Sequence, residues 1–399
     1  MSYPYHVKCV TAVLTAFACA LLPRTSLATP TFAVLYNFTG LADGDHPQCA
    51  LIEDAQGNLY GTTAAGGITN VPAAGPRTGS MVGPQYGVLF RLAPDGTETV
   101  MHEFGIGKDG ANPRAGVITD AKGNMYGTTA FGGPSYAGTV FEMTPAGKET
   151  ILHKFAGGTD GAVPEASLVR AGSNYYGTTN EGGSFGAGTV FMVGPKHAYS
   201  VLFSFTGATT GSFPLGGLVL DSAGNLYGDT YFGGNGDYGT VFMLSPSGTE
   251  TILYSFKAGK DGKSPAGSLL RDGAGNLYGV TYAGGKTNDG TVFKLSPAGT
   301  EHQLHVFAGA PNDGAGPYSA LIMDAQGNMY GTTSQGGTSD FGTVFELSPK
   351  GAITILHNFS GSDGEAPLAP LLLDAQGNLY GTTSLGGTAN SGVVFEISP

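Results

Sequence analysis

The sequence has no tryptophan, only three cysteines, and charged residues make up just 12% of its 399 positions. So little charge is unusual for a chain of long exposed helices, whereas short strands joined by tight turns need few charged residues. Cys9 and Cys19 lie in a segment that we expect to be removed, so Cys49 would stand alone and no internal disulfide is possible. The sequence also lacks the motifs of zinc proteases, α/β-hydrolases, phosphate loops and dinucleotide-binding folds.

Residues 1–28 have the pattern of a signal peptide. Lys8 precedes the mostly apolar residues 9–22, and Ser26-Leu27-Ala28 supplies small residues for cleavage. The apolar run is too short for a comfortable membrane span, and no other stretch is long enough. Removal of Lys8 and Arg24 moves the net charge from −12 to −14. The acidic mature chain argues against nucleic acid and anionic membranes as partners, and we expect a secreted protein.

Glycine is abundant, with 68 residues, and it recurs with a long period. An Asn-Leu-Tyr-Gly-like unit occurs seven times, at intervals of 50 to 52 residues after a first interval of 66. The long first interval reflects an expanded loop at 68–86, and insertions in repeat proteins often lie on the binding face. The tyrosines of the seven units are Tyr60, Tyr126, Tyr176, Tyr227, Tyr278, Tyr330 and Tyr380.

Each copy contains four short apolar segments, here called strands A to D, separated by turn sequences. In the sixth copy they are 320–323, 328–333, 342–347 and 353–359. About fifty residues with four strands is the size of one propeller blade. Residues 31–38 form a strand D that precedes the first complete copy, and the last copy ends before its own strand D. We therefore predict that 31–399 form one all-β, seven-bladed propeller, with four antiparallel strands per blade and the ring closed by 31–38 in the C-terminal blade.

The repeated pattern Asp-Gly-x-x-Pro, Gly-Asn-Leu-Tyr-Gly-Thr-Thr, Gly-Gly, Gly-Thr-Val-Phe, Ser-Pro-x-Gly and a closing Phe resembles the GloVer tandem-repeat family over about residues 31–399. These are secreted bacterial proteins with a choice of C-terminal anchors. The resemblance implies export and a propeller-like fold, but it supplies no reaction and no catalytic residues. No anchoring tail precedes Pro399, so the resemblance does not imply retention at a cell surface.

Six of the loops between strand D and the next strand A carry an Asp-Gly pair three residues before a proline. Carboxylates around one channel mouth would suit a hard cation such as Ca²⁺. Recurrence in nearly every blade instead favours a role in forming the turns, and we expect most of these carboxylates to bond to backbone N–H groups of their own turn. If these carboxylates instead bind a cation, the ligands are Asp43, Asp109, Asp160, Asp261, Asp313 and Asp363.

The loops between strands B and C carry aromatic residues in five consecutive blades. Exposed rings on one face would form a platform for sugar rings or apolar partners, and the alternative is that they fill gaps between blades. His46, in a D–A loop without an evident counterpart in other blades, and Arg77, in the expanded loop, are further ligand-binding candidates. The aromatic candidates are Phe131, Tyr136, Tyr231, Phe232, Tyr238, Tyr282 and Phe341.

Other histidines share one position of strand D with tyrosine and phenylalanine, which indicates ring packing between blades rather than catalysis. Cys49 aligns with small residues, so we interpret it as a filler near the crowded axis. The sequence predicts a monomeric binding module for a glycan, small molecule or protein at the channel face. The alternative is an enzyme acting on extracellular polysaccharide or lactone with a channel-bound metal, because propellers host such reactions but the fold alone does not decide.

Overall fold

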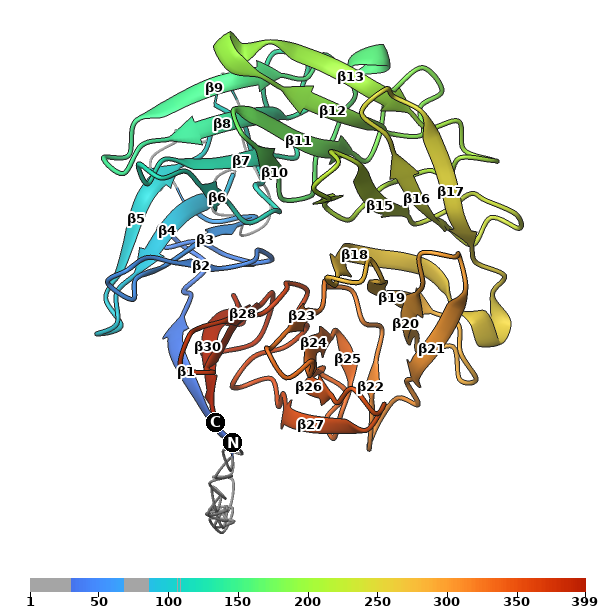
Figure 1. The fold of residues 1–399 in the computed structure, drawn as a ribbon. Helices are drawn as coiled ribbons and strands as arrows, with labels where there is room; N and C mark the ends of the chain where they lie inside the picture. Colours follow the sequence, from blue (N-terminus) through green and yellow to red (C-terminus); the bar gives the residue numbers. More distant parts are fainter. Residues whose placement is uncertain (1–29, 68–85, 106, 108) are drawn as a thin grey trace, which may run out of the picture.

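The computed structural model describes residues 30–67, 86–105, 107 and 109–399. They form seven four-stranded antiparallel sheets arranged in a ring (Figure 1), so the predicted seven-bladed propeller is confirmed. Within these residues no helix is long and apolar enough to cross a membrane. The helical elements described are three single 3₁₀ turns: η1 (Gly158–Asp160), η2 (Pro195–His197) and η3 (Gly259–Asp261). The proposed signal peptide and most of the expanded loop lie outside the described residues.

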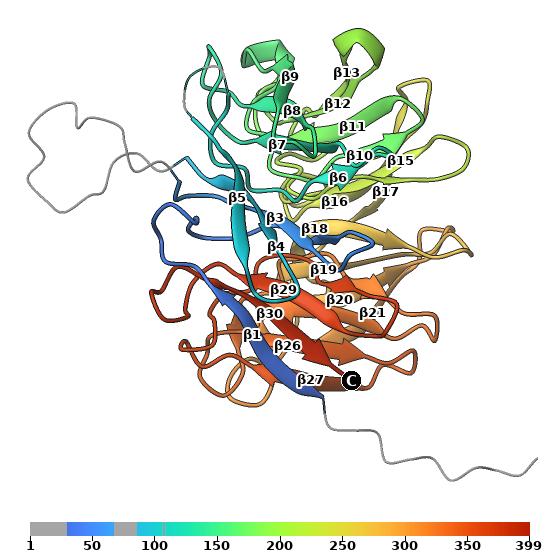
Figure 2. The ribbon, with the colours of Figure 1, turned by 90° about the vertical axis from the view of Figure 1, so that its left-hand side faces the viewer.

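The two ends of the described chain share one blade, as predicted. β1 (Thr31–Asn37) pairs with β30 (Val393–Ser398) in antiparallel register from Thr31 opposite Ser398 to Asn37 opposite Val393. Figures 1 and 2 show β1 in blue beside β30 in red. Since β1 supplies the outer strand of blade 7, the ring is closed by hydrogen bonds between segments more than 350 residues apart. This closure gives β30 a partner on its outer side, as the third strand of every other blade has.

The seven blades share one order of strands, from the short strand A at the axis to the long outer strand D. Blade 7 consists of β28 (Leu372–Leu373), β29 (Leu379–Thr383), β30 and β1. Blades 1 to 3 are β2 (Ile52–Glu53), β3 (Leu59–Thr63), β4 (Val88–Leu92) and β5 (Glu98–Glu103); β6 (Ile118–Thr119), β7 (Met125–Thr129), β8 (Thr139–Met143) and β9 (Glu149–Lys154); and β10 (Val169–Ala171), β11 (Asn174–Thr179), β12 (Thr189–Val193) and β13 (Tyr199–Ser204).

Blades 4 to 6 repeat this plan, and blade 6 carries an additional two-stranded ladder in its loops. They are β14 (Val219–Leu220), β15 (Leu226–Thr230), β16 (Thr240–Leu244) and β17 (Glu250–Ser255); β18 (Lys263–Arg271), β19 (Leu277–Ala283), β20 (Thr291–Leu295) and β21 (Glu301–Val306); and β23 (Ile322–Met323), β24 (Met329–Thr333), β26 (Thr343–Leu347) and β27 (Ile353–Asn358), with β22 (Gly314–Ala315) paired to β25 (Gln335–Gly336).

The repeated motif has a local physical role in each blade. In blade 1, Asp54 of the A–B turn accepts hydrogen bonds from the side chain of Asn58 at 2.8 Å and from the hydroxyl of Tyr60 at 2.8 Å. Gly61 lies opposite Phe90, and a Cβ on this glycine would come 2.7 Å from the ring. The motif therefore requires Asn and Tyr to hold the turn and Gly to admit the phenylalanine of strand C.

The closing phenylalanine of strand D joins each blade to the next one. Phe38 is fully buried and meets the ring of Phe90 edge-on, with 5.2 Å between the centroids. Aromatic pairs in this arrangement contribute about 0.5–1.5 kcal/mol beyond the area that they bury. The same contact joins Phe104 with Phe141, Phe155 with Phe191, Phe205 with Phe242, Phe256 with Phe293, Phe307 with Phe345, and Phe359 with Phe395.

Candidate functional site

The axis of the ring contains a cavity of about 130 Å³, which residues at or just before strand A of all seven blades line. In six blades the residue that follows the repeated proline lines this cavity, and its identity varies from blade to blade. Sequence reasoning missed this position, although its signal was present: Gln, Arg, Glu and Tyr alternate with apolar residues between repeated neighbours. The lining residues from this position are Gln48, Arg114, Glu165, Leu215, Tyr318 and Leu368.

Two of these residues form an ion pair between neighbouring blades. The guanidinium of Arg114 donates to Glu165 Oε1, and Asn180 Nδ2 donates to Glu165 Oε2 at 3.2 Å. Arg114 also lies over the ring of Phe131, 5.6 Å from its centroid. Burial raises the pKa of Glu165, and the charge of Arg114 opposes this shift. The channel wall therefore holds a polar group with fixed geometry between blades 2 and 3.

A wider depression of about 730 Å³ lies on the face formed by the D–A and B–C loops. Three of the predicted aromatic residues, Tyr231, Tyr282 and Phe341, line it together. The rings of Tyr282 and Tyr318 are perpendicular, with centroids 6.0 Å apart, and burial raises the pKa of Tyr318 to about 12. The polar lining residues are Gln48, Ser334, Gln335, Asp340 and Glu365. The depression therefore combines aromatic ring faces with both hydrogen-bond donors and hydrogen-bond acceptors.

The remaining predicted aromatic residues lie apart from this depression. Phe131 stacks on Tyr136 in blade 2, with centroids 5.7 Å apart, and Tyr136 is 49% exposed. Phe232 contacts both Tyr231 and Phe213 edge-on. Tyr238 is exposed on the B–C loop of blade 4. The B–C aromatics are therefore divided, and only part of the set borders the channel mouth.

His46 forms a local pair rather than a cluster with the other blade 1 candidates. Its Nδ1 lies 2.8 Å from Asp45 Oδ1, and the interaction of its N–H with the Asp45 carboxylate raises the pKa of His46. Arg77 lies outside the described residues. The idea that His46 has no counterpart is wrong, because every blade has a residue with positive φ directly before the repeated proline. These residues are His46, Asn112, Val163, Phe213, Ser264, Gly316 and Ala366.

Each of the six D–A aspartates is held within its own turn and beside its own outer strand. In the turn between blades 2 and 3, for example, Asp160 accepts from the N–H of Ala156 at 2.7 Å and contacts His153 Nε2 at 3.1 Å. The other contacts from strand D are Tyr36 to Asp43 at 3.0 Å, His102 to Asp109 at 3.3 Å, Tyr254 to Asp261 at 2.5 Å, His305 to Asp313 at 2.9 Å and His357 to Asp363 at 3.0 Å.

The interpretation of the strand D histidines as ring-packing residues alone is therefore incomplete. His153 does stack on Tyr199 of the next blade at 3.6 Å, but its imidazole also bonds to Asp160. The chain contains a sequence signal for this pairing. The one D–A turn with Thr210 in place of aspartate has Phe203, which cannot form a hydrogen bond, on its strand D. Considering the two positions separately hides this correlation.

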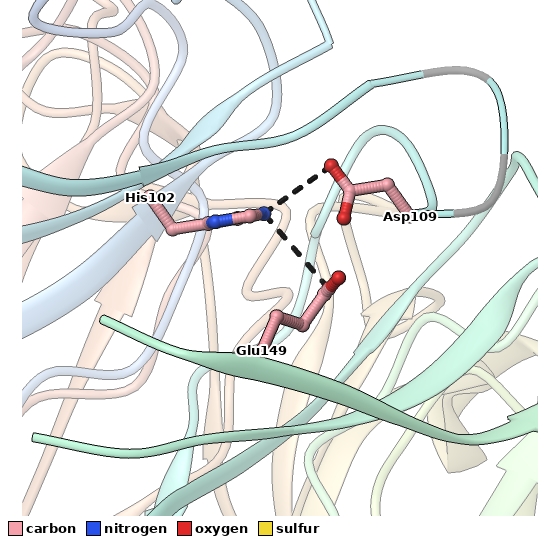
Figure 3. A group of neighbouring side chains, drawn as sticks. All are labelled: His102, Asp109 and Glu149. Carbon is pink, nitrogen blue, oxygen red and sulfur yellow. Dashed lines mark ion pairs between the residues drawn. The ribbon is translucent and has the colours of Figure 1, made fainter. Parts of the chain in front are cut away.

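One aspartate has a third polar neighbour. His102 Nε2, on β5, lies 3.3 Å from Asp109 Oδ2 and 3.9 Å from Glu149 Oε1, on β9 (Figure 3). Burial, followed by the hydrogen bond and the charge of Asp109, raises the pKa of Glu149 to about 9. Burial opposes ionisation of Asp109, but the neighbouring polar groups of His102 and Glu149 lower its pKa overall. In the described part of the chain this is the only group of three or more such side chains within metal-binding distance.

Two buried polar residues near the axis differ in chemistry. The thiol of Cys49 is 1% exposed, and burial raises its pKa to about 11, which suits a filler and not a nucleophile. Asp229 is 2% exposed, and neither carboxyl oxygen has a hydrogen-bond partner. Burial raises the pKa of Asp229 well above its ordinary value.

The profile of the Gloeobacter/Verrucomicrobia repeat matches residues 77–274 and 251–399. No curated protein sequence matches the chain. Among solved structures, it is similar to the extracellular domain of a putative hybrid two-component system of B. thetaiotaomicron, with 14% identity, a TM-score of 0.56, and coverage of 93% of this chain and 41% of that one.

Two other solved structures are similar in fold. One is PorZ of Porphyromonas gingivalis, described as a bacterial surface component of the type-IX secretion system, with 14% identity, a TM-score of 0.54 and coverage of 89% and 46%. The other is a putative 6-phosphogluconolactonase of Bacteroides uniformis, with 16% identity, a TM-score of 0.51 and coverage of 74% and 84%. The chain thus spans less than half the length of the first and second of these three proteins.

Proposed function

Because the chain belongs to the Gloeobacter/Verrucomicrobia repeat family and forms a closed propeller, we propose that it is an exported binding module whose ligand is a glycan held at the channel mouth. The observation that carries this proposal is the depression in which Tyr231, Tyr282 and Tyr318 share a wall with carboxylates and amides. Sugars present apolar C–H faces and many hydroxyl groups, so they match a site with ring faces and paired donors and acceptors.

Export is supported by the signal-peptide pattern of residues 1–28. Two similar structures are described as an extracellular domain and a surface component, which agrees with export of this chain. The position of the candidate metal-binding group favours a binding role over a metal-dependent reaction in the channel. Among the described residues, the group within metal-binding distance lies on two outer strands and a D–A turn, and none of its members lines the axial cavity or the depression.

The proposal is tested by a glycan array with the mature protein, followed by calorimetric titration of the best oligosaccharide. Replacement of Tyr282 by alanine should weaken binding by about 5- to 150-fold, since a stacked ring is worth about 1–3 kcal/mol in binding (by analogy with base stacking). Tyr136→Ala is the control, because Tyr136 is a tyrosine of the B–C loop of blade 2 that is exposed but does not line the depression. Equal losses in both variants, or no bound glycan, would contradict the proposal.

A further inference from the structure

The boundaries between blades bring three side-chain positions together at the outer side of the ring. The first position lies on strand D, two residues before the closing phenylalanine. The second is the residue of the following D–A turn that is usually aspartate. The third lies at the start of strand D of the next blade. Direct contacts show the arrangement: His153 stacks on Tyr199 at 3.6 Å, and His357 stacks on Phe32 at 3.6 Å.

The composition of these three positions differs from one boundary to the next. Only the boundary between blades 1 and 2 combines an imidazole with two carboxyl groups, in His102, Asp109 and Glu149. The other boundaries, in chain order from the N-terminus, carry Tyr36, Asp43 and Glu98; His153, Asp160 and Tyr199; Phe203, Thr210 and Glu250; Tyr254, Asp261 and Glu301; His305, Asp313 and Ile353; and His357, Asp363 and Phe32.

The geometry of the blade 1–2 boundary is close to that of a coordination sphere. One ligand atom from each residue lies within 4.8 Å of the other two. Tetrahedral Zn²⁺ holds nitrogen and oxygen ligands at about 2.0–2.2 Å, which places neighbouring ligand atoms roughly 3.4 Å apart. The separation of 3.3 Å between His102 and Asp109 already fits. The 3.9 Å between His102 and Glu149 requires a small rotamer adjustment.

The same atoms lack well-formed protein partners. His102 Nε2 and Glu149 Oε1 are inaccessible to solvent and form no hydrogen bond of good geometry with each other or with Asp109. Buried polar atoms are normally satisfied, so unpaired donor and acceptor atoms that face one another require an explanation. The corresponding histidines of blades 2, 5 and 6 have no such deficit, since each contacts its aspartate at 3.1 Å or less.

We propose that His102, Asp109 and Glu149 bind a divalent transition-metal ion of the Zn²⁺ class, which clamps blade 1 to blade 2. The nitrogen ligand favours Zn²⁺ or a similar ion over Ca²⁺ and Mg²⁺, which prefer oxygen ligands alone. Three protein ligands leave a further coordination position for water. The ion would connect β5, the D–A turn and β9, and would stabilise the ring in proportion to its concentration over its dissociation constant.

The experiment uses the mature protein without an affinity tag, stripped with chelator and titrated with Zn²⁺ by calorimetry. We expect one Zn²⁺ per chain, a raised melting temperature and no comparable binding of Ca²⁺. Zinc binding with no dependence on His102, or a preference for Ca²⁺, would overturn the proposal.

Two exchanges of side chains make the test independent of folding defects. His102→Tyr gives the boundary the composition that the fold already accepts around Tyr254, Asp261 and Glu301. It should abolish the site while the protein stays folded. Tyr254→His places an imidazole beside Asp261 and Glu301, and it should raise the stoichiometry to two. Unchanged stoichiometry in both variants, with melting curves that show folded protein, contradicts the proposal.

Discussion

Asp229 provides the sharpest test of the energetics near the axis. In five blades a threonine of strand B donates its hydroxyl to a backbone carbonyl of the next blade, as Thr62 does to Ala115 at 2.9 Å and Thr178 to Gly216 at 3.2 Å. Asp229 occupies this position in blade 4, where its carboxyl group is buried without a partner. It lies beside Gly216, where an added Cβ would come 3.1 Å from Oδ1. The equivalent acceptor is the carbonyl of Gly267.

Asp229→Thr should therefore stabilise the protein. Removal of an unsatisfied buried polar group is worth about 1–3 kcal/mol, and the new hydroxyl bond adds about 1 kcal/mol. The unfolding entropy of about 2.1 cal/mol/K per residue amounts to roughly 0.8 kcal/mol/K for about 370 residues. A gain of about 2–4 kcal/mol thus raises the melting temperature by roughly 3–5 °C.

The effect should depend on pH with a definite sign. The pKa of Asp229 is raised in the folded state, so the folded protein keeps a proton that the unfolded chain releases above about pH 4. The wild-type protein therefore loses stability as the pH rises, by about 1.4 kcal/mol per pH unit until the folded pKa is reached. The variant lacks this loss, so the difference in melting temperature should widen by roughly 2 °C per unit between pH 5 and pH 7.

Calorimetric melting of both proteins at pH 5, 6 and 7 measures this difference, and other titrating groups cancel in it. Asp229→Asn is the control, because it removes the titration while it preserves the shape of the side chain. It should show the same pH dependence relative to wild type, with a smaller gain at pH 5. A difference that stays constant with pH, or a destabilised Asp229→Thr protein, would refute the reasoning.

Three further predictions follow from contacts that recur around the ring. Phe38→Ala should lower the free energy of unfolding by about 3–5 kcal/mol in a denaturant titration, because this fully buried ring joins blade 7 to blade 1; deletion of residues 31–38 should cost more, and an unchanged midpoint would argue against closure by β1. Phe203→Tyr combined with Thr210→Asp should add the missing hydrogen bond and stabilise by about 1 kcal/mol, with a coupling energy in a double-mutant cycle, and simple additivity would show that no bond formed. Cys49 should resist a thiol reagent at pH 8 in the folded protein and react fully in denaturant, since its pKa is about 11, and rapid labelling of the native state would contradict its burial.

Much of the architecture was predictable because the repeat is a local signal copied seven times. Each copy carries its own turn residues, and Asn58, Tyr60 and Gly61 act within one blade. Counting the outer strands also predicted closure, because the N-terminal copy has an extra strand D and the C-terminal copy lacks one. The functional positions were harder to find. The alignment of His46 was missed, and the variable residue after the proline was not recognised as the channel lining.

The sequence by itself determined the number of blades, the turn chemistry, the place of each strand and the closing segment, because these follow from hydrogen bonds and packing between residues close in the chain or at equivalent repeat positions. Only the tertiary structure decided which non-equivalent positions meet. His102 contacts Glu149 because the outer strands of neighbouring blades are staggered by about four residues, and Tyr231, Tyr282 and Tyr318 share a depression because loops from different blades converge at the axis. Stagger and convergence depend on the twist of the sheets and the curvature of the ring, which no single repeat encodes.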